Sequence, residues 1–272
     1  MIYDLQKASL LKRVSAWLLD AILLCVLMVG CIWMISGLVG YDAQSQKLEN
    51  YYTQYETQYH VSFDYVSFGY SALTDEEKAA YDAMTEAERI AFDEAYRAAC
   101  DEAYQAMIQN DDVIYTYNLV LQMTILMVCV GLFLAMLILE FLVPLLFGHG
   151  RTVGKRVFNL AVMRTDSVQI RGISLFIRAV LGKYAIETMV PVFVVTMWLL
   201  GILGFGGTLV LAVLLVVQVC MLIATPTNAL IHDKLSDTVV VDMSSQMIFA
   251  TREARLAYQK DQAAETAQQQ HY

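Results

Sequence analysis

Charged residues are scarce in this chain. Asp, Glu, Lys and Arg make up 17% of its 272 residues, against 58% hydrophobic residues, whereas soluble domains carry about 25% charged residues. This composition excludes an ordinary soluble domain and indicates an integral membrane protein. The net charge is −9, but most of the acidic residues lie within 41–117, so the acidity says little about partners of the apolar remainder. We expect no nucleic acid among them.

The chain also has few cysteines and no recognisable catalytic set. Four of its five cysteines lie in apolar runs and only Cys100 lies in a polar region, so neither a disulfide framework nor a metal site is indicated. No Ser/His/Asp set or dinucleotide fingerprint occurs, and the GRTVGKR stretch at 150–156 lacks the spacing of a phosphate-binding loop. We therefore expect no enzymatic activity, no metal and no cofactor.

Long hydrophobic runs are what the chain does contain. Four runs, at 17–39, 119–147, 185–204 and 208–224, approach or exceed the ~20 residues that cross a bilayer core. They predict an all-α membrane protein with four transmembrane helices and a helical extracytoplasmic insert between spans 1 and 2. The predicted segments are the N-terminal segment with span 1 (1–40), the acidic insert (41–117), span 2 (118–147), a basic connection (148–184), spans 3 and 4 (185–224) and a C-terminal tail (225–272).

The insert carries two signals for helix starts. Thr74 and Thr85 are each followed three residues later by a glutamate, which is the capping-box pattern. The pattern predicts a short helix over 75–83 and a longer one over about 86–109. We expect these helices to pack through apolar and aromatic side chains, namely Tyr81, Met84, Ile90, Phe92, Tyr96 and Met107.

Lysines and arginines gather at the N-terminus, in the 148–184 connection and after span 4. Because cytoplasmic span ends carry an excess of such residues, we predict that both termini are cytoplasmic and that the insert lies outside. Within the connection, residues 173–184 resemble an amphipathic helix lying in the membrane interface. Lys155 and Arg156 are expected to face anionic lipid headgroups.

One carboxylate lies inside the first apolar run. Arg13 stands at its entrance and Asp20 follows seven residues later, which is about two helical turns, so both project from nearly the same face. A carboxylate at that depth must face protein or a water-filled cavity, because exposure to lipid costs several kcal/mol. We expect a cation from the cytoplasmic side to pair with Asp20. The candidates, in order, are Arg178 and then Arg13 or Lys183.

Three sequence blocks surround these charges. ASLLKRVSAWLLD contains Arg13 and Asp20, NALIHDKLSDTVVV contains Asp233, and GRTVGKRVFNLAVMRTD has the form G-x-T-x-G-K-R followed by a Val-containing, strand-like piece. Together they resemble the RDD family of bacterial membrane proteins, which is named for an arginine and two aspartates. The resemblance implies a multi-pass protein of the bacterial inner membrane. Members are often supposed to be transporters, with ion or proton exchange suggested for some, and the resemblance supplies no substrate.

The candidate charge cluster consists of Arg13, Asp20, Asp233 and Arg178. On one interpretation it binds or relays a cation or proton across the spans. On the other it is a fixed ion-pair network that clamps span 1 to the cytoplasmic segments. Removal of one member of a buried pair destabilises the protein in either case, so the sequence leaves both open.

Three more titratable residues are candidates for a proton or ion relay, namely Glu140, Glu187 and His232. The glutamates lie near the cytoplasmic ends of their spans, where a proton-coupled carrier would place carboxylates. Lys183, one turn before Glu187, favours a local ion pair instead. His232 titrates near neutrality and suits a pH switch, while helix capping or loop fixing is the alternative.

The sequence thus predicts a small transporter or a cation/proton exchanger. Its expected partners are the lipid bilayer, a small cation or proton, and further copies of the chain, because four helices enclose little room for a pathway. The alternative is a non-transporting scaffold or accessory subunit that binds a partner through the acidic insert. A solvated cavity that reaches Asp20 or Glu140 favours transport. Paired charges in a dry core, with an exposed apolar or aromatic surface on 41–117, favour the scaffold.

Overall fold

The computed structural model describes residues 8–199, 201–202 and 204–269. The chain forms two compact units. The first unit combines the N-terminal residues through Cys31 with the residues from Gly131 onward, and the second unit spans Ile32–Val130.

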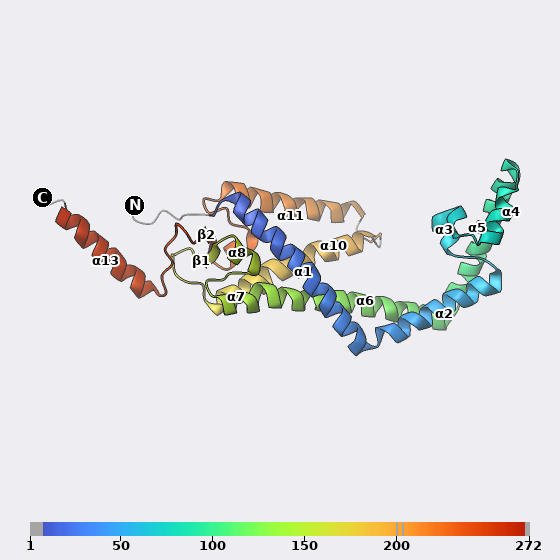
Figure 1. Ribbon diagram of the computed structural model, residues 1–272, viewed down its shortest axis with the longest axis horizontal. Coiled ribbons are helices and arrows are strands. Elements are labelled where there is room, and N and C mark those ends of the chain that lie inside the picture. The colour runs from blue at the N-terminus through green and yellow to red at the C-terminus, as the bar shows by residue number, and fades with distance from the viewer. Residues whose placement is uncertain (1–7, 200, 203, 270–272) are drawn as a thin grey trace. The chain divides into compact units, whose positions relative to one another are not determined.

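Among the described residues, four helical segments are long and apolar enough to cross a membrane (Figure 1). Large apolar side chains along them are exposed, such as Trp33 and Leu38 on the first and Ile223 on the fourth, as expected for surfaces that face lipid. The mostly helical, multi-pass fold is therefore confirmed. The segments are α1 (Leu10–Val39) in span 1, α6 (Asp111–Leu137), η2 (Ile138–Leu142) and α7 (Val143–Phe147) in span 2, α9 (Gly172–Phe176), η3 (Ile177–Met189) and α10 (Val190–Leu199) in span 3, and α11 (Gly204–Ala224) in span 4.

Span 3 begins earlier than the sequence predicts. Residues 173–184 are helical as predicted, but they are not distinct from span 3, because helical structure runs without a break over Gly172–Trp198. Its middle part, η3, is π-helical, a form that often occurs at functional sites. Arg178 lies in this part and is only 3% exposed. The basic residues that suggested an interfacial face are thus turned toward protein partners.

A small antiparallel sheet completes the first unit. β1 (Leu160–Arg164) pairs with β2 (Thr238–Asp242), with Val162 opposite Val240. The strand-like piece after GKR is therefore a strand, whereas β2 lies in the segment that the sequence predicts as a C-terminal tail. Ala8 at the start of the described chain donates its N–H to Val240 O at 3.3 Å, which ties the sheet to the beginning of α1. The other helices of this unit are α8 (Val153–Val157), α12 (Ile231–Leu235) and α13 (Arg252–Gln269).

The second unit contains the helical insert. Its helices are α2 (Tyr41–Tyr59), α3 (Asp64–Phe68), the 3₁₀ helix η1 (Gly69–Ala72), α4 (Asp75–Asp82) and α5 (Glu86–Ile108). Both predicted capping boxes are present, at Thr74 and Thr85. The polar first half of the insert is helical as well, which the sequence did not indicate.

Aromatic packing joins the two predicted insert helices. Tyr81 on α4 contacts Phe92 on α5, and Phe92 contacts Tyr96. The expected role of Ile90 is wrong, because its side chain is 56% exposed. Ile90 precedes Phe92 by two residues, which places it about 200° around the helix from the packed face.

Candidate functional site

Asp20, on α1, is buried at 5% exposure. Thr152 Oγ1 donates to Asp20 Oδ2 at 2.5 Å and Gly154 N–H donates to Oδ1 at 2.7 Å. Thr152 also caps α8, since its hydroxyl accepts the N–H of Lys155. A Cβ at Gly154 would lie 2.2 Å from Ala16 O, so the close approach of α8 to α1 requires glycine. The GRTVGKR block is therefore a docking element for the Asp20 face of α1.

The partner of Asp20 differs from the predicted one. Arg178 donates to Asp233 instead. The two carboxylate oxygens of Asp20 accept hydrogen bonds from the Thr152 hydroxyl and the Gly154 N–H. The cation within ion-pair distance of Asp20 is Lys155, with its Nζ 3.9 Å from Oδ2. Sequence spacing could rank the cations but could not show that neutral donors would take the nearest positions.

Lys155 does not face lipid headgroups, so the headgroup-facing role that the sequence predicts for it is wrong. It is only 8% exposed, and its ammonium lies 3.2 Å from Thr152 Oγ1 and 3.8 Å from Glu140 Oε2. Burial, partly offset by Glu140, lowers the pKa of Lys155 to about 8. The neighbouring Arg156 is exposed and lies over the Phe147 ring, 4.4 Å from its centroid. The two residues of the predicted headgroup pair thus lie in different environments.

Glu140 lies in the π-helical η2 of span 2 and is 8% exposed. Lys183 Nζ donates to its Oε1, and Lys155 approaches its Oε2. The local pair expected between Lys183 and Glu187 is therefore wrong. A carboxylate buried at membrane depth needs a cation, and Lys183 reaches across from span 3 to supply one.

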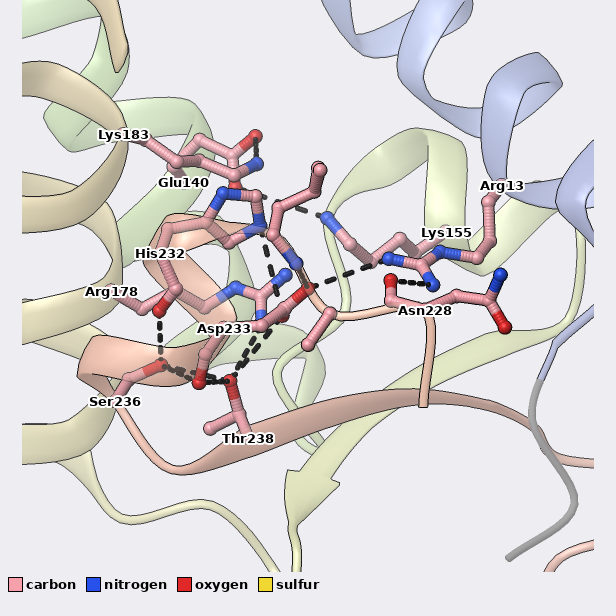
Figure 2. Close-up of polar contacts among 12 residues, drawn as sticks. Arg13, Glu140, Lys155, Arg178, Lys183, Asn228, His232, Asp233, Ser236 and Thr238 are labelled. Atoms are coloured by element: carbon pink, nitrogen blue, oxygen red, sulfur yellow. Dashed lines mark hydrogen bonds and ion pairs between the residues drawn. The ribbon is translucent and has the colours of Figure 1, made fainter. Parts of the chain in front are cut away.

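Asp233, on α12, is 1% exposed and receives two arginines (Figure 2). Arg178 Nη1 donates to Oδ1, and Arg13 Nη2 lies 3.4 Å from Oδ2. Arg13 also donates to Asn228 O at 2.7 Å. Burial by itself would raise the pKa of Asp233, but Arg178, with His232 and Arg13, outweighs it and holds that pKa well below its usual range. The predicted cluster thus splits in two: Arg13 and Arg178 pair with Asp233, and Asp20 belongs to a second group.

His232 is buried beside Glu187. Its Nδ1 lies 2.7 Å from Glu187 Oε2, and since a carboxylate only accepts, Nδ1 carries the hydrogen. Burial is the main cause that lowers the pKa of His232, which keeps the ring neutral near pH 7. A Cβ at Gly182 on η3 would lie 2.5 Å from His232 Cβ. The backbone of η3 at Gly182 therefore packs directly against α12.

These groups converge on one cavity of about 470 Å³ in the first unit. Its wall is apolar near Trp17 and Leu24 of α1. Its three carboxylates and the nearby Asp233 are matched by four lysines and arginines of the lining, so the site has no net charge when His232 is neutral. Among the described residues, no group of three or more His, Cys, Asp or Glu side chains could hold a metal ion. The titratable lining residues are Arg13, Asp20, Glu140, Lys155, Arg178, Lys183, Glu187 and His232.

Thr152 is a member of the site that sequence reasoning missed. Its side chain is fully buried and links Asp20, Lys155 and the start of α8. The available signal was a threonine directly before a short helix, which is a preferred N-cap residue. The helix itself was not predictable from periodicity, because the five residues Val153–Val157 are too few to show a helical pattern.

The model of the RDD family matches residues 90–237, which is more than half of the chain. The chain belongs to the RDD family. The match contains Lys155, Arg178 and Asp233, whereas Arg13 and Asp20 precede it. No curated protein and no solved structure matches the chain. Family membership and the helices together make this an RDD multi-pass membrane protein.

Proposed function

We propose that this RDD protein is a small transporter that exchanges a monovalent cation for a proton across the membrane. The observation that carries the proposal is the cavity of about 470 Å³ that reaches both Asp20 and Glu140. Carboxylates and lysines inside membrane helices are costly to bury, and they commonly mark ion pathways and proton relays. Three of the four predicted spans place such groups on this cavity.

The arrangement of the pairs supports exchange as well as clamping. Arg178, Arg13 and Asp233 form a closed network, in which Arg178 also donates to Thr238 Oγ1 and the Thr238 hydroxyl and the Leu230 N–H donate to Asp233. This suits a fixed anchor. At Glu140, Lys183 holds Oε1, while Lys155 lies 3.8 Å from Oε2 and makes no short bond there. We assign the fixed role to the Asp233 network and the ion-exchanging role to the Asp20 and Glu140 side.

The proposal includes the cellular setting. We place the protein in the bacterial inner membrane with both termini cytoplasmic, following the lysine and arginine distribution. We also propose that copies assemble into an oligomer, because four spans leave little room for a complete pathway. Transport needs no chemical conversion, so no enzymatic activity and no cofactor are proposed.

The test is uptake of tracer cations by proteoliposomes. Full-length protein is reconstituted with an acidic interior, and uptake of Li⁺, Na⁺ and K⁺ is measured against empty liposomes. The wild type should take up at least one of them, and Asp20→Asn should abolish uptake. Asp261→Asn, in the exposed part of α13, is the matched control and should transport normally. Uptake equal to empty liposomes by correctly folded wild type would refute the proposal.

A second function has one observation in its favour. On the insert, Phe68 is 66% exposed and Tyr104 is 46% exposed, which fits a scaffold that binds a protein partner through aromatic anchors. Phe68→Ser with Tyr104→Ser should then reduce co-purification of that partner without changing cation uptake. Unchanged co-purification would count against the scaffold.

A further inference from the structure

Lys155 occupies an unusual position within the cavity. Its ammonium has three oxygen neighbours, Thr152 Oγ1 at 3.2 Å, Glu140 Oε2 at 3.8 Å and Asp20 Oδ2 at 3.9 Å. Charge-assisted hydrogen bonds between ammonium and carboxylate are about 2.7–2.9 Å long. The ammonium therefore lies between the carboxylates of Asp20 and Glu140 and makes a short hydrogen bond with neither of them.

The two carboxylates do not depend on Lys155 alone. Asp20 is held by Thr152 and Gly154, and Glu140 is held by Lys183. Both acceptors therefore stay in place when the ammonium changes. Oxygen atoms of carboxylates and hydroxyls are the ligands that hard cations prefer, so the ammonium lies where such a cation could be bound.

We propose that Lys155 is the coupling residue of this transporter, a tethered cation that loses its proton when a monovalent cation binds between Asp20 and Glu140. The step is balanced: Lys155 passes from R–NH₃⁺ to R–NH₂, one proton leaves to solvent, and one monovalent cation enters. The charge of the site is unchanged. This inference rests on the proposed function, and it names the residue that couples the two fluxes.

The charges around Lys155 agree with such a step. Glu140 on η2 and Asp20 on α1 favour the charged ammonium, while Lys183 and Arg178 on η3 oppose it. Burial opposes it most, and together these effects lower its pKa to about 8. Lys155 can therefore release a proton near physiological pH, which an exposed lysine with a pKa of about 10.4 cannot do. An arginine at the same place would stay charged.

The experiment measures proton release by the full-length protein in detergent. LiCl, NaCl or KCl is added to protein in weakly buffered solution with a pH indicator, with choline chloride as the blank. The wild type should release up to one proton per chain with at least one of these salts. Its apparent affinity for that cation should weaken about tenfold for each pH unit below 8, because one proton competes with one cation.

Three variants separate coupling from simple stabilisation. Lys155→Arg should bind no cation, because its charge cannot be lost. Lys155→Met should bind the cation without proton release and without pH dependence. Lys12→Met removes a lysine that pairs with Asp242 outside the cavity lining, and it should behave as the wild type. Thermal unfolding checks that each variant is folded, and the wild-type proton release provides a test even if Lys155→Met does not fold.

The outcomes distinguish this inference from the transport proposal. Proton release by the wild type that is lost in Lys155→Arg supports the coupling role, even if liposomes show no flux, in which case only transport fails. Cation binding by Lys155→Arg equal to the wild type overturns the coupling role and leaves transport intact. Absence of cation binding by the wild type also overturns it.

Discussion

At the residue scale, the buried charges divide into an anchor and a pair of carboxylates that share Lys155 at longer distance. The anchor is Asp233, which holds Arg178 and Arg13. Removing one member of such a pair leaves uncompensated charge in protein. The stability of the first unit should therefore depend more on Asp233 than on any exposed acid nearby.

Asp233→Asn should lower the free energy of unfolding by about 3–5 kcal/mol. Asp237→Asn is the matched control, because Asp237 is exposed and its positive φ of 51° suits asparagine equally well. Thermal unfolding in detergent measures both. Equal stability of the two variants would show that the network around Asp233 is not an anchor.

The pH dependence of this anchor has a defined sign. The pKa of Asp233 is depressed in the folded protein, so its contribution to stability is present above the unfolded pKa of about 3.9 and is lost as the pH falls below it. The stability difference between wild type and Asp233→Asn should therefore shrink between pH 5 and the acid limit of folding, about the window expected for such a carboxylate. A difference that grows toward acid pH would contradict the assignment.

Gly154→Ala should release α8 from α1, because the added Cβ would meet Ala16 O. The expected loss is about 1–3 kcal/mol of stability, as for other overpacked sites. Gly30→Ala is the control. Gly30 lies on α1, and no atom lies within 4 Å of a Cβ added there, so the substitution should be neutral or stabilising. Thermal unfolding again provides the measurement, and equal behaviour of the two variants would count against the docking role of Gly154.

At the element scale, the capping boxes of the insert are the clearest case of structure specified locally. Thr85 caps α5 and receives the reciprocal contact from Glu88. Thr85→Ala should cost about 1 kcal/mol of local stability and speed hydrogen exchange in the first turn of α5. Thr57→Ala, whose hydroxyl donates to Thr53 O within α2, should leave exchange in α5 unchanged.

The same box predicts a pH effect. Hydrogen bonds from Thr85 lower the pKa of Glu88, so the box stabilises α5 above the usual pKa of a glutamate and weakens as the pH falls below it. Hydrogen exchange in this turn, corrected for the intrinsic rate at each pH, should become less protected in acid. Constant protection would show that the box contributes nothing.

What the sequence could predict follows from how local each signal is. Apolar runs and the Thr-x-x-Glu boxes involve residues within a few positions of one another, and both were predicted correctly. Asp20 was correctly placed against protein because burial follows from its depth. Its partner was not predictable, because Thr152 and Gly154 reach it only through the docking of α8, and the same holds for Lys155 and for β2, which pairs with a strand more than 70 residues earlier.

At the scale of the whole molecule, the positions of lysines and arginines define the proposed orientation. A cysteine introduced at Asp261 should react with a membrane-impermeant maleimide only after the inner face of the membrane is made accessible. A cysteine at Glu76 in the insert should react in intact cells. The reverse pattern would overturn the orientation, while leaving the four spans unaffected.

The central claim is that Asp20 and Glu140 exchange an ion and do not merely clamp helices together. The most direct measurement is the internal pH of proteoliposomes that carry an imposed acid interior, after external addition of Li⁺, Na⁺ or K⁺. Wild-type protein should raise the internal pH in response to at least one of these cations, and an equally folded Glu140→Gln variant should not. An internal pH that stays constant with folded wild-type protein, for every cation tested, would contradict the account.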